Sequence, residues 1–480
     1  MNTSYHRLDP RHSVWGLALL VALFAVIGGL VTAFAGPLGA LALFIAVAAA
    51  AVVLRSIEVG FWSVIAVVAL IPFATLPIDI GLTPTFLDLA IGAVLAVWLL
   101  GLVTGQQKTI VLSPITLPLL IFMLVAVFSF IFGLSNGPLT PTLLRKFAEL
   151  LLSLGFVLVI IDYCTSWERL ERLVRVLLLA GAAASGIAIL LWLVPDDTAN
   201  SALNVLSRVG YPGGFVIRYI EENPELAERA IGTSVDPNVL GGLLLMMGAL
   251  IGPQLVTREP LFSRRFTIFM AFFIFVAIVL TFSRSAMLGL ASGLIFVTAV
   301  RYRRLLPYMA AGALLLLLLP VAQEYLARFL EGAQGQDLAT QMRFGEYRDA
   351  LTLIQRYPIF GVGFSGTPDI DIYLGVANVY LTIAQMMGIV GLLSFFTVII
   401  TLFAYAFLNR AWFRTHPRQD AVWLGLHAAI VGALVAGVFD HYLFNLEFHH
   451  AVTAFWMISG LAVSATHLGV GSQQQDTDAT

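Results

Sequence analysis

The chain of 480 residues has one cysteine, Cys164, and very few charged residues. A single cysteine excludes an internal disulfide bond and a cysteine-based metal cage. Only 11% of the residues are charged and 59% are hydrophobic, a composition outside the range of soluble globular proteins. The formal net charge of −2 gives no sign of a nucleic-acid partner. The sequence also has no His-Glu-x-x-His pattern and no evident internal repeat. What is left is a polytopic membrane protein.

Apolar runs long enough to cross a lipid bilayer recur throughout the chain. The first run follows Arg7 and Arg11 and ends like a signal-peptide cleavage site. We interpret it as an uncleaved span, because it is long and many spans follow it. We expect an all-α fold with about 12–14 transmembrane helices. The expected spans are 14–35, 38–54, 60–79, 86–104, 115–134, 142–162, 173–194, 238–257, 265–282, 284–301, 305–321, 386–408, 420–440 and 450–468.

The positions of the basic residues predict an orientation. With the N-terminus in the cytoplasm, basic clusters fall on every second loop, as the positive-inside rule requires. Both termini are then cytoplasmic, and the intervening loops face the periplasm if the protein lies in a bacterial inner membrane. The basic residues on the cytoplasmic side are Arg7, Arg11, Arg55, Lys108, Arg169, Arg172, Arg175, Arg258, Arg264, Arg265, Arg301, Arg303, Arg304, Arg410, Arg414 and Arg418.

Two segments on the opposite side are much longer than ordinary connections, and function is expected there. They divide the chain into six parts. These are the N-terminal spans 1–194, a first extracytoplasmic loop 195–237, the core spans 238–321, a large extracytoplasmic loop 322–378, the C-terminal spans 379–468 and a cytoplasmic tail 469–480 that we expect to be disordered.

Arg284 stands between two apolar runs, in the segment Thr281–Met287. A charge at the centre of a membrane helix costs about 2.5–3.5 kcal/mol on insertion scales. A bound anion and an ion-paired structural latch are the two explanations we consider. The flanking Ser283 and Ser285 have no His and Asp at the spacing of a hydrolase triad, so we expect them to bond the local backbone.

The large loop contains a predicted helix over residues 337–355, which Pro358 ends. Its apolar residues share one face, and Arg343, Glu346, Arg348 and Asp349 lie off that face. A surface helix with internal ion pairs, such as Arg343 with Glu346, is the ordinary alternative to a functional role.

Three weaker patterns remain open. Residues 361–366 match the dinucleotide fingerprint, but no βαβ unit surrounds them and a flexible turn is expected. Asp369 and Asp371 resemble a metal-binding pair. Polar residues also gather at the last outside turn, where they could bind a metal, supply a general base or lie at the level of the lipid headgroups. They are Asp440, His441, Glu447, His449 and His450.

Taken together, these features resemble the O-antigen ligase and polysaccharide polymerase superfamily over roughly residues 200–445. The order of the motifs carries the resemblance. They are Arg229-Ala-Ile-Gly-Thr, Asp236-Pro-Asn-Val-Leu-Gly, Thr281-x-Ser-Arg284-Ser-Ala, Arg343 with Tyr347 and Ala350-Leu351, Tyr357-Pro-x-Phe-Gly-x-Gly363, and Asn378 with Gly388 and Gly391.

The resemblance implies a GT-C-like membrane glycosyltransferase that uses a glycan on polyprenyl pyrophosphate, with no nucleotide, metal or other cofactor. Ligases of the family carry a histidine directly before the asparagine, where this chain has Ala377. The departure favours a polymerase over a ligase. A transporter or flippase for lipid-linked sugars is the main rival from another class, and a scaffold role is a third interpretation. The implied partners are the donor, a glycan acceptor, membrane lipids and proteins of polysaccharide export or chain-length control.

The same resemblance suggests roles for individual residues. Arg284 and Arg343 would clamp the pyrophosphate, because arginine stays charged and binds phosphate bidentately. The candidates for a general base are Glu346, Asp440 and His441, and the sequence does not choose among them. The candidate substrate-binding residues are Asn378 and Tyr380, followed by Arg229, Tyr347 and Arg348.

Overall fold

The computed structural model describes residues 56–76, 83–105, 109–316, 338–367 and 375–478, together with the single residues 318, 323, 327 and 334. The expected spans 14–35 and 38–54 and the pair Asp369 and Asp371 lie outside these residues. In the part that is described, two short antiparallel strands, β1 (Arg218–Tyr219) and β2 (Glu228–Arg229), form the only sheet. Nearly all other regular structure is helical, so the prediction of an all-α fold is confirmed.

Seven helices of the described chain are long and apolar enough to cross a membrane, which confirms a polytopic membrane protein. They are α3 (Phe86–Val103), α4 (Thr116–Gly133), α6 (Trp167–Leu193), α8 (Pro237–Val256), α14 (Val379–Leu408), α15 (Pro417–Ala436) and α16 (His449–Asp478). Further helices along the chain are α2 (Ile57–Leu70), α5 (Pro141–Tyr163), α7 (Asp196–Val205), α9 (Arg264–Leu280), α10 (Arg284–Val300), α11 (Leu306–Leu316) and α13 (Leu338–Arg356), with 3-10 turns η1 (Leu206–Val209), η2 (Ile220–Glu222), η3 (Arg303–Leu305) and η4 (Trp412–Thr415).

Most helix bounds agree with the expected spans to within a few residues. The helix α6 begins six residues before the expected position, and three other differences have identifiable reasons. The helix α2 ends at Leu70, because the backbone before Pro72 disfavours helical geometry. The helix α14 begins seven residues before the expected position, where the Asn378 side chain caps it by accepting a hydrogen bond from Leu381 N (2.9 Å). The helix α16 continues to Asp478, so the expected disorder from residue 469 is wrong. Gly469 lets this helix pack on Phe413, where a Cβ atom would lie 2.5 Å from the ring.

The helices α8, α15 and α16 form the centre of the bundle. Within their apolar windows 83%, 78% and 89% of the residues are buried, against 17% in the peripheral α3. Small residues bring the central helices into backbone contact: a Cβ on Gly432 of α15 would lie 2.7 Å from the carbonyl oxygen of Gly289 of α10. Such close approach is how transmembrane helices gain packing energy without a hydrophobic driving force. It also brings the ends of α8, α10 and α15 together.

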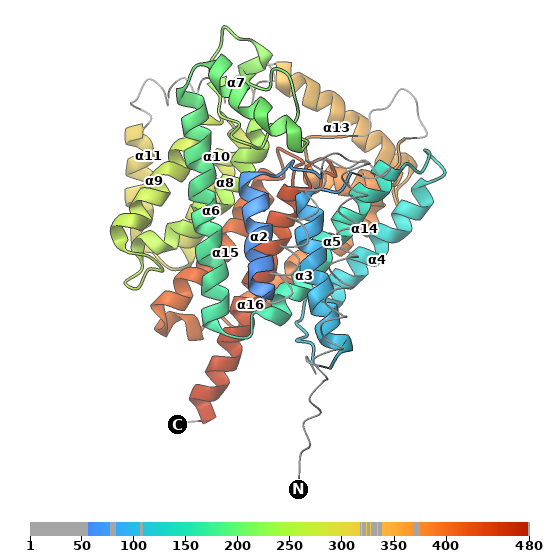
Figure 1. Cartoon of the computed structure of the whole chain (residues 1–480). Helices are drawn as coiled ribbons and strands as arrows, with labels where there is room; N and C mark the ends of the chain where they lie inside the picture. The colour runs from blue at the N-terminus through green and yellow to red at the C-terminus, as the bar shows by residue number, and fades with distance from the viewer. Residues whose placement is uncertain are drawn as a thin grey trace, which may run out of the picture.

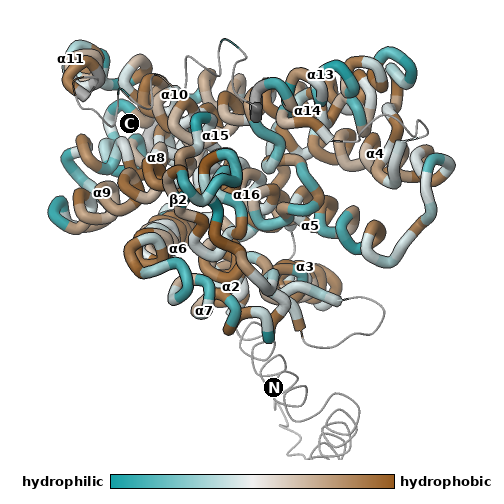
Figure 2. Tube along the Cα trace, turned by 90° about the horizontal axis from the view of Figure 1, so that it is seen from above, coloured by the Kyte–Doolittle hydropathy of each residue, from teal (hydrophilic) through white to brown (hydrophobic). Residues whose placement is uncertain are grey.

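Helices stand side by side in Figure 1, with α7 and α13 at the upper end of the bundle and the C-terminus of α16 at the lower end. Seen from above, hydrophilic residues gather on α7 and along α13, whereas the surrounding helices are mostly hydrophobic (Figure 2). The polar upper end is therefore where a water-soluble group could meet the membrane-spanning helices.

The segment 357–363 is a fixed turn between two spans. Val362 N donates to Gln385 O (2.9 Å). Both Gly361 and Gly363 have positive φ, and a Cβ on either would overlap the backbone of α14 or α4. The prediction of a turn is therefore confirmed, and the turn packs against α14 on one side and α4 on the other. It also interrupts α14 at Gly388 (φ 67°), because Ile389 N donates to Pro358 O (2.7 Å) outside the helix.

Candidate functional site

Arg284 is the first residue of α10, and a tight turn from α9 delivers it there. Thr281 and Ser283 are buried in this turn, and Ser283 Oγ lies 3.1 Å from Ser285 Oγ and caps the helix at Ala286 N. Ser283 therefore makes the local backbone bond expected of it, and Ser285 bonds the side chain of Ser283. Phe282 has a φ of 51°, a left-handed conformation that non-glycine residues rarely adopt. Backbone strain of this kind persists where the surrounding structure enforces it, and it concentrates at functional sites.

Arg229 connects this turn to the beginning of α8. Its Nε donates to Thr281 O (2.9 Å) and its Nη2 donates to Asn238 Oδ1 (2.8 Å). Asp236 caps α8 by accepting from Asn238 N (2.7 Å). The preceding Val235 also has a positive φ, of 63°, which is a clear outlier for a β-branched residue. Two strained residues thus flank the region where the sequence-predicted Arg229 and the Arg284 turn meet.

The segment after α15 supplies the next residues of the site. Asp440 is buried, and its Oδ1 lies 3.2 Å from Nδ1 of His441. Burial and then the negative charge of Asp440 raise the pKa of Asp236, so these two carboxyl groups are neighbours. Tyr442 packs directly on Gly242 of α8, where a Cβ atom would overlap its ring. The close fit fixes the Asp440 segment against the beginning of α8.

His441 lies among three carboxyl groups from three different parts of the chain. Burial lowers its pKa, but the nearby Asp440 carboxylate, with smaller contributions from Asp236 and Glu346, outweighs burial and raises the pKa above its ordinary value of 6.5. The imidazole therefore keeps its proton to higher pH than a free histidine. In this state it is a cation, which suits it to bind an anion better than to accept a proton.

The helix α13 brings its polar face to the same place. Glu346 Oε2 accepts a hydrogen bond from Ala377 N (2.9 Å), and Tyr347 Oη donates to Ala377 O (3.3 Å). The pKa of Tyr347 is raised overall, mainly by burial. The positive charge of Arg343 opposes the shift, and the negative charges of Glu346 and Asp440 add to it. The charges of Arg343, Glu346 and Asp440 are all near enough to affect this one phenol.

Other predicted residues have structural partners. Asn378 both caps α14 and donates from Nδ2 to Val438 O (2.9 Å). Tyr380 donates to Leu434 O (2.7 Å) and stacks on Phe396, in the contact between α14 and α15. Arg348 is exposed on α13. The roles of these side chains toward a substrate, like the convergence of Arg284 and Arg343 on one anion, stay predictions.

The polar cluster that the sequence places at the last outside turn is divided in the structure. Asp440 and His441 belong to the site just described. Glu447 forms an ion pair with Lys146. The ring of His450 packs edge-on against Phe73, with 5.1 Å between the ring centroids. His449 faces Asp88 of α3 and Glu149 of α5. The residues of this short stretch of chain therefore belong to two separate parts of the structure.

Two residues of the site are absent from the sequence-based candidates, Asp236 and Tyr442, and Ser234 lies two residues before Asp236. Ser234 Oγ, Tyr442 Oη and Asp440 Oδ2 are buried side-chain atoms without a hydrogen-bond partner among the described residues. Buried polar atoms are seldom left unpaired, and a bound polar ligand is one explanation. The sequence did contain a signal for Asp236: Asp followed by Pro is typical of a helix N-terminus, and the Asp236-Pro-Asn segment begins α8.

The arrangement defines a polytopic membrane protein with a polar, arginine-containing site at one end of its helical bundle. Residues 269–396 match the family profile described as O-antigen ligase. The match extends from α9 into α14 and includes the Arg284 turn, α13 and Asn378. It confirms the resemblance of this segment to the O-antigen ligase and polysaccharide polymerase superfamily. No curated protein matches the chain.

Proposed function

We propose that this protein is an integral membrane glycosyltransferase that polymerises glycan repeat units carried on polyprenyl pyrophosphate. The reaction would take place at the outer face of the bacterial inner membrane, with both termini of the chain in the cytoplasm. One observation carries the proposal: buried polar atoms of Asp440 and Tyr442 that have no partner in the described chain lie against the beginning of α8, which Arg229 and the Arg284 turn also contact. A sugar phosphate offers both the hydroxyl groups and the negative charge that such a site could bind.

The chemistry explains the need for arginine. When the glycosidic bond to the donor breaks, negative charge develops on the pyrophosphate oxygen, and fixed cations lower the barrier by stabilising that charge. Arg284 is at the N-terminus of α10, where the helix dipole also favours an anion. Arg343 would come from α13, and the raised pKa of His441 allows a third cation near them.

The acceptor hydroxyl needs a base, and the geometry favours Glu346 for this role. Because the pKa of His441 is raised, more of its imidazole is protonated at a given pH, and the protonated ring cannot accept a further proton. Glu346 is hydrogen-bonded to the backbone of Ala377, the position where ligases of the family carry histidine. We propose that Glu346 accepts the hydroxyl proton and that Asp440 holds His441 in its charged form.

Deletion of the gene, followed by analysis of surface glycans, tests the class of reaction. If the protein is a polymerase, the deletion strain should lose the polymer while single repeat units are still attached to their acceptor. The ligase alternative predicts that polymer accumulates without attachment. Loss of all outward-facing lipid-linked glycan would instead support the rival flippase, which moves the lipid-linked sugar without making a glycosidic bond.

A further inference from the structure

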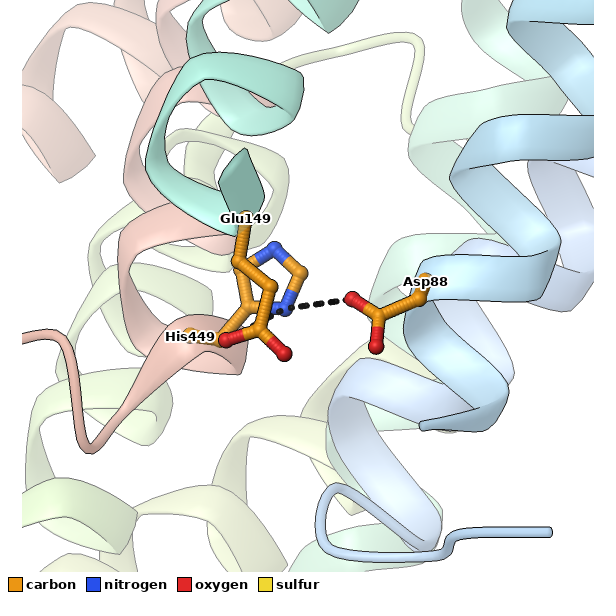
Figure 3. A group of neighbouring side chains, drawn as sticks. All are labelled: Asp88, Glu149 and His449. Atoms are coloured by element: carbon orange, nitrogen blue, oxygen red, sulfur yellow. Dashed lines mark ion pairs between the residues drawn. The ribbon is translucent and has the colours of Figure 1, made fainter. Parts of the chain in front are cut away.

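Three ionisable side chains from three helices meet away from the candidate site. Asp88 lies in the first turn of α3, Glu149 in α5 and His449 at the first residue of α16. One nitrogen or oxygen ligand atom from each lies within 4.8 Å of the other two. Figure 3 shows the three side chains pointing toward one another across the space between the helices. The helices α3 and α16 both pack on α5, and of the three residues Glu149 and His449 are buried and Asp88 is partly buried.

His449 makes the cluster more than a pair of acids. Its side chain is only 9% exposed, and neither ring nitrogen has a hydrogen-bond partner among the described residues. Asp88 Oδ1, which faces it, is also buried without one. A buried imidazole with both nitrogens unpaired is costly, because each polar atom loses its hydration without replacement. The Nδ1 atom of the ring faces the two carboxyl groups, so an ion bound between them would give this nitrogen and Asp88 Oδ1 a partner.

The spacing of the ligand atoms fits a metal ion better than direct hydrogen bonds. His449 Nδ1 lies 3.6 Å from Asp88 Oδ1 and 3.9 Å from Glu149 Oε2. A charge-assisted hydrogen bond would bring such atoms to about 2.7–2.9 Å. Two ligands at about 2.0–2.2 Å from one tetrahedral zinc ion are roughly 3.3–3.6 Å apart. The observed separations are therefore close to those of two ligands that share an ion.

Arg145 occupies the other side of both carboxyl groups. Its Nη1 contacts Glu149 Oε1 and lies 3.7 Å from Asp88 Oδ2. The backbone N of Thr85 also donates to Asp88 Oδ2 (2.8 Å). These contacts orient the carboxyl groups and leave Asp88 Oδ1 and Glu149 Oε2 turned toward the imidazole. Outer partners of this kind typically position the ligands of a metal site.

We propose that Asp88, Glu149 and His449 bind a divalent transition-metal ion of intermediate softness, such as Zn²⁺ or Mn²⁺. One imidazole nitrogen and two carboxylate oxygens suit these ions, whereas Mg²⁺ and Ca²⁺ prefer oxygen ligands alone. The ion would join α3, α5 and α16 and stabilise the bundle. None of the three ligands belongs to the proposed glycosyltransferase site, so this metal is a structural component that the transfer reaction does not use.

The test is direct metal analysis of the full-length protein purified in detergent. After treatment with a chelator, incubation with Zn²⁺ or Mn²⁺ and removal of free ions, elemental analysis should find about one tightly bound ion per chain. His449→Gln and Glu149→Gln should each weaken binding at least about 100-fold, because loss of an outer partner alone costs about 10–100-fold. Wild-type protein without a stoichiometric ion, or variants that bind as tightly as the wild type, would overturn the proposal.

His450→Gln is the matched control, since His450 follows His449 directly, is also buried and is not part of the cluster. It should bind metal like the wild type, and an equal loss in this variant would count against the cluster as the site. If the ligand variants do not fold, Co²⁺ gives a second measurement on the wild-type chain. A visible absorption band that Zn²⁺ abolishes in equimolar amount supports the proposal, and its absence contradicts it.

Discussion

Glu346 and Ala377 are joined by a hydrogen bond of 2.9 Å from the backbone N of Ala377 to the carboxylate of Glu346. The side chain of Ala377 cannot accept a proton, although ligases of the family carry a histidine there. The bond brings a carboxylate from α13 to that position. It indicates how a chain without the histidine could still provide a base.

Glu346→Gln should therefore reduce polymer formation without disrupting the fold. The amide keeps the hydrogen bond to Ala377 but cannot take up a proton, and general-base catalysis contributes about 10²–10⁴-fold to rate. We expect a loss within that range in an assay of polymer length and amount in cells of the deletion strain. Asp349→Asn, on the same helix, is the control and should polymerise normally. Normal polymer from Glu346→Gln would rule out this residue as the base.

The arginine clamp makes a separate prediction. Arg284→Ala and Arg343→Ala should each lower the rate by about 10²–10³-fold, the usual loss when one stabilising group for a developing negative charge is removed. Arg284→Lys should recover only part of the activity, because lysine keeps the charge without the bidentate geometry. Arg208→Ala removes an exposed arginine from the loop after α7 and should leave polymer formation unchanged. Membrane levels of each variant must be compared with those of the wild type.

The environment of His441 predicts a pH-dependent stability. Its pKa is raised in the folded protein, with Asp440, Asp236 and Glu346 facing it. The stabilisation is therefore complete below the ordinary pKa of 6.5 and is lost as the pH rises through the raised value. The difference in thermal midpoint between the wild type and His441→Gln should be largest at acidic pH and decrease above neutrality. Replacing Asp440 by Asn should flatten this dependence, and a difference that grows with pH would contradict the assignment.

The contact between α10 and α15 predicts a large effect of a small change. Gly432→Leu would place side-chain atoms where even a Cβ lies 2.7 Å from the Gly289 carbonyl oxygen. Overpacking costs typically about 1–3 kcal/mol, and here the obstacle is backbone that cannot rotate away. The thermal midpoint of the detergent-purified variant should fall clearly. Gly186→Leu on α6, where no atom of the described residues lies within 4 Å of a Cβ, should change it little.

The sequence predicts the fold well because the apolar runs are long, and a long apolar run in a membrane protein forms a helix. It places helix ends less well where a side chain decides them, as Asn378 does at the beginning of α14. The motifs around Arg229, Arg284, Arg343 and Asn378 indicate the candidate site. Because the motifs are far apart in the sequence, the sequence alone does not show which of their residues are in contact. Asp236 approaches Asp440 only because α8 and α15 pack together.

The division of the last polar turn could not be predicted for the same reason. His441 and His449 are eight residues apart, yet one faces Asp440 and the other faces α3 and α5. Glu149 is an acid inside an expected span, and such residues usually have a function. That signal was available in the sequence, but its partner Asp88 is 61 positions earlier and only the packed helices bring the two together.

A reaction with purified components examines the proposed activity without the complications of a cell. The detergent-purified protein is mixed with polyprenyl-pyrophosphate-linked repeat units, without nucleotide or an ion gradient, and the glycan products are separated by size. We expect a ladder of lengthened glycans and released lipid pyrophosphate from the wild type, and no ladder from the Arg284→Ala and Arg343→Ala proteins. Donor that stays unconverted by folded wild-type protein, or an equal ladder from both arginine variants, would contradict the proposed polymerase.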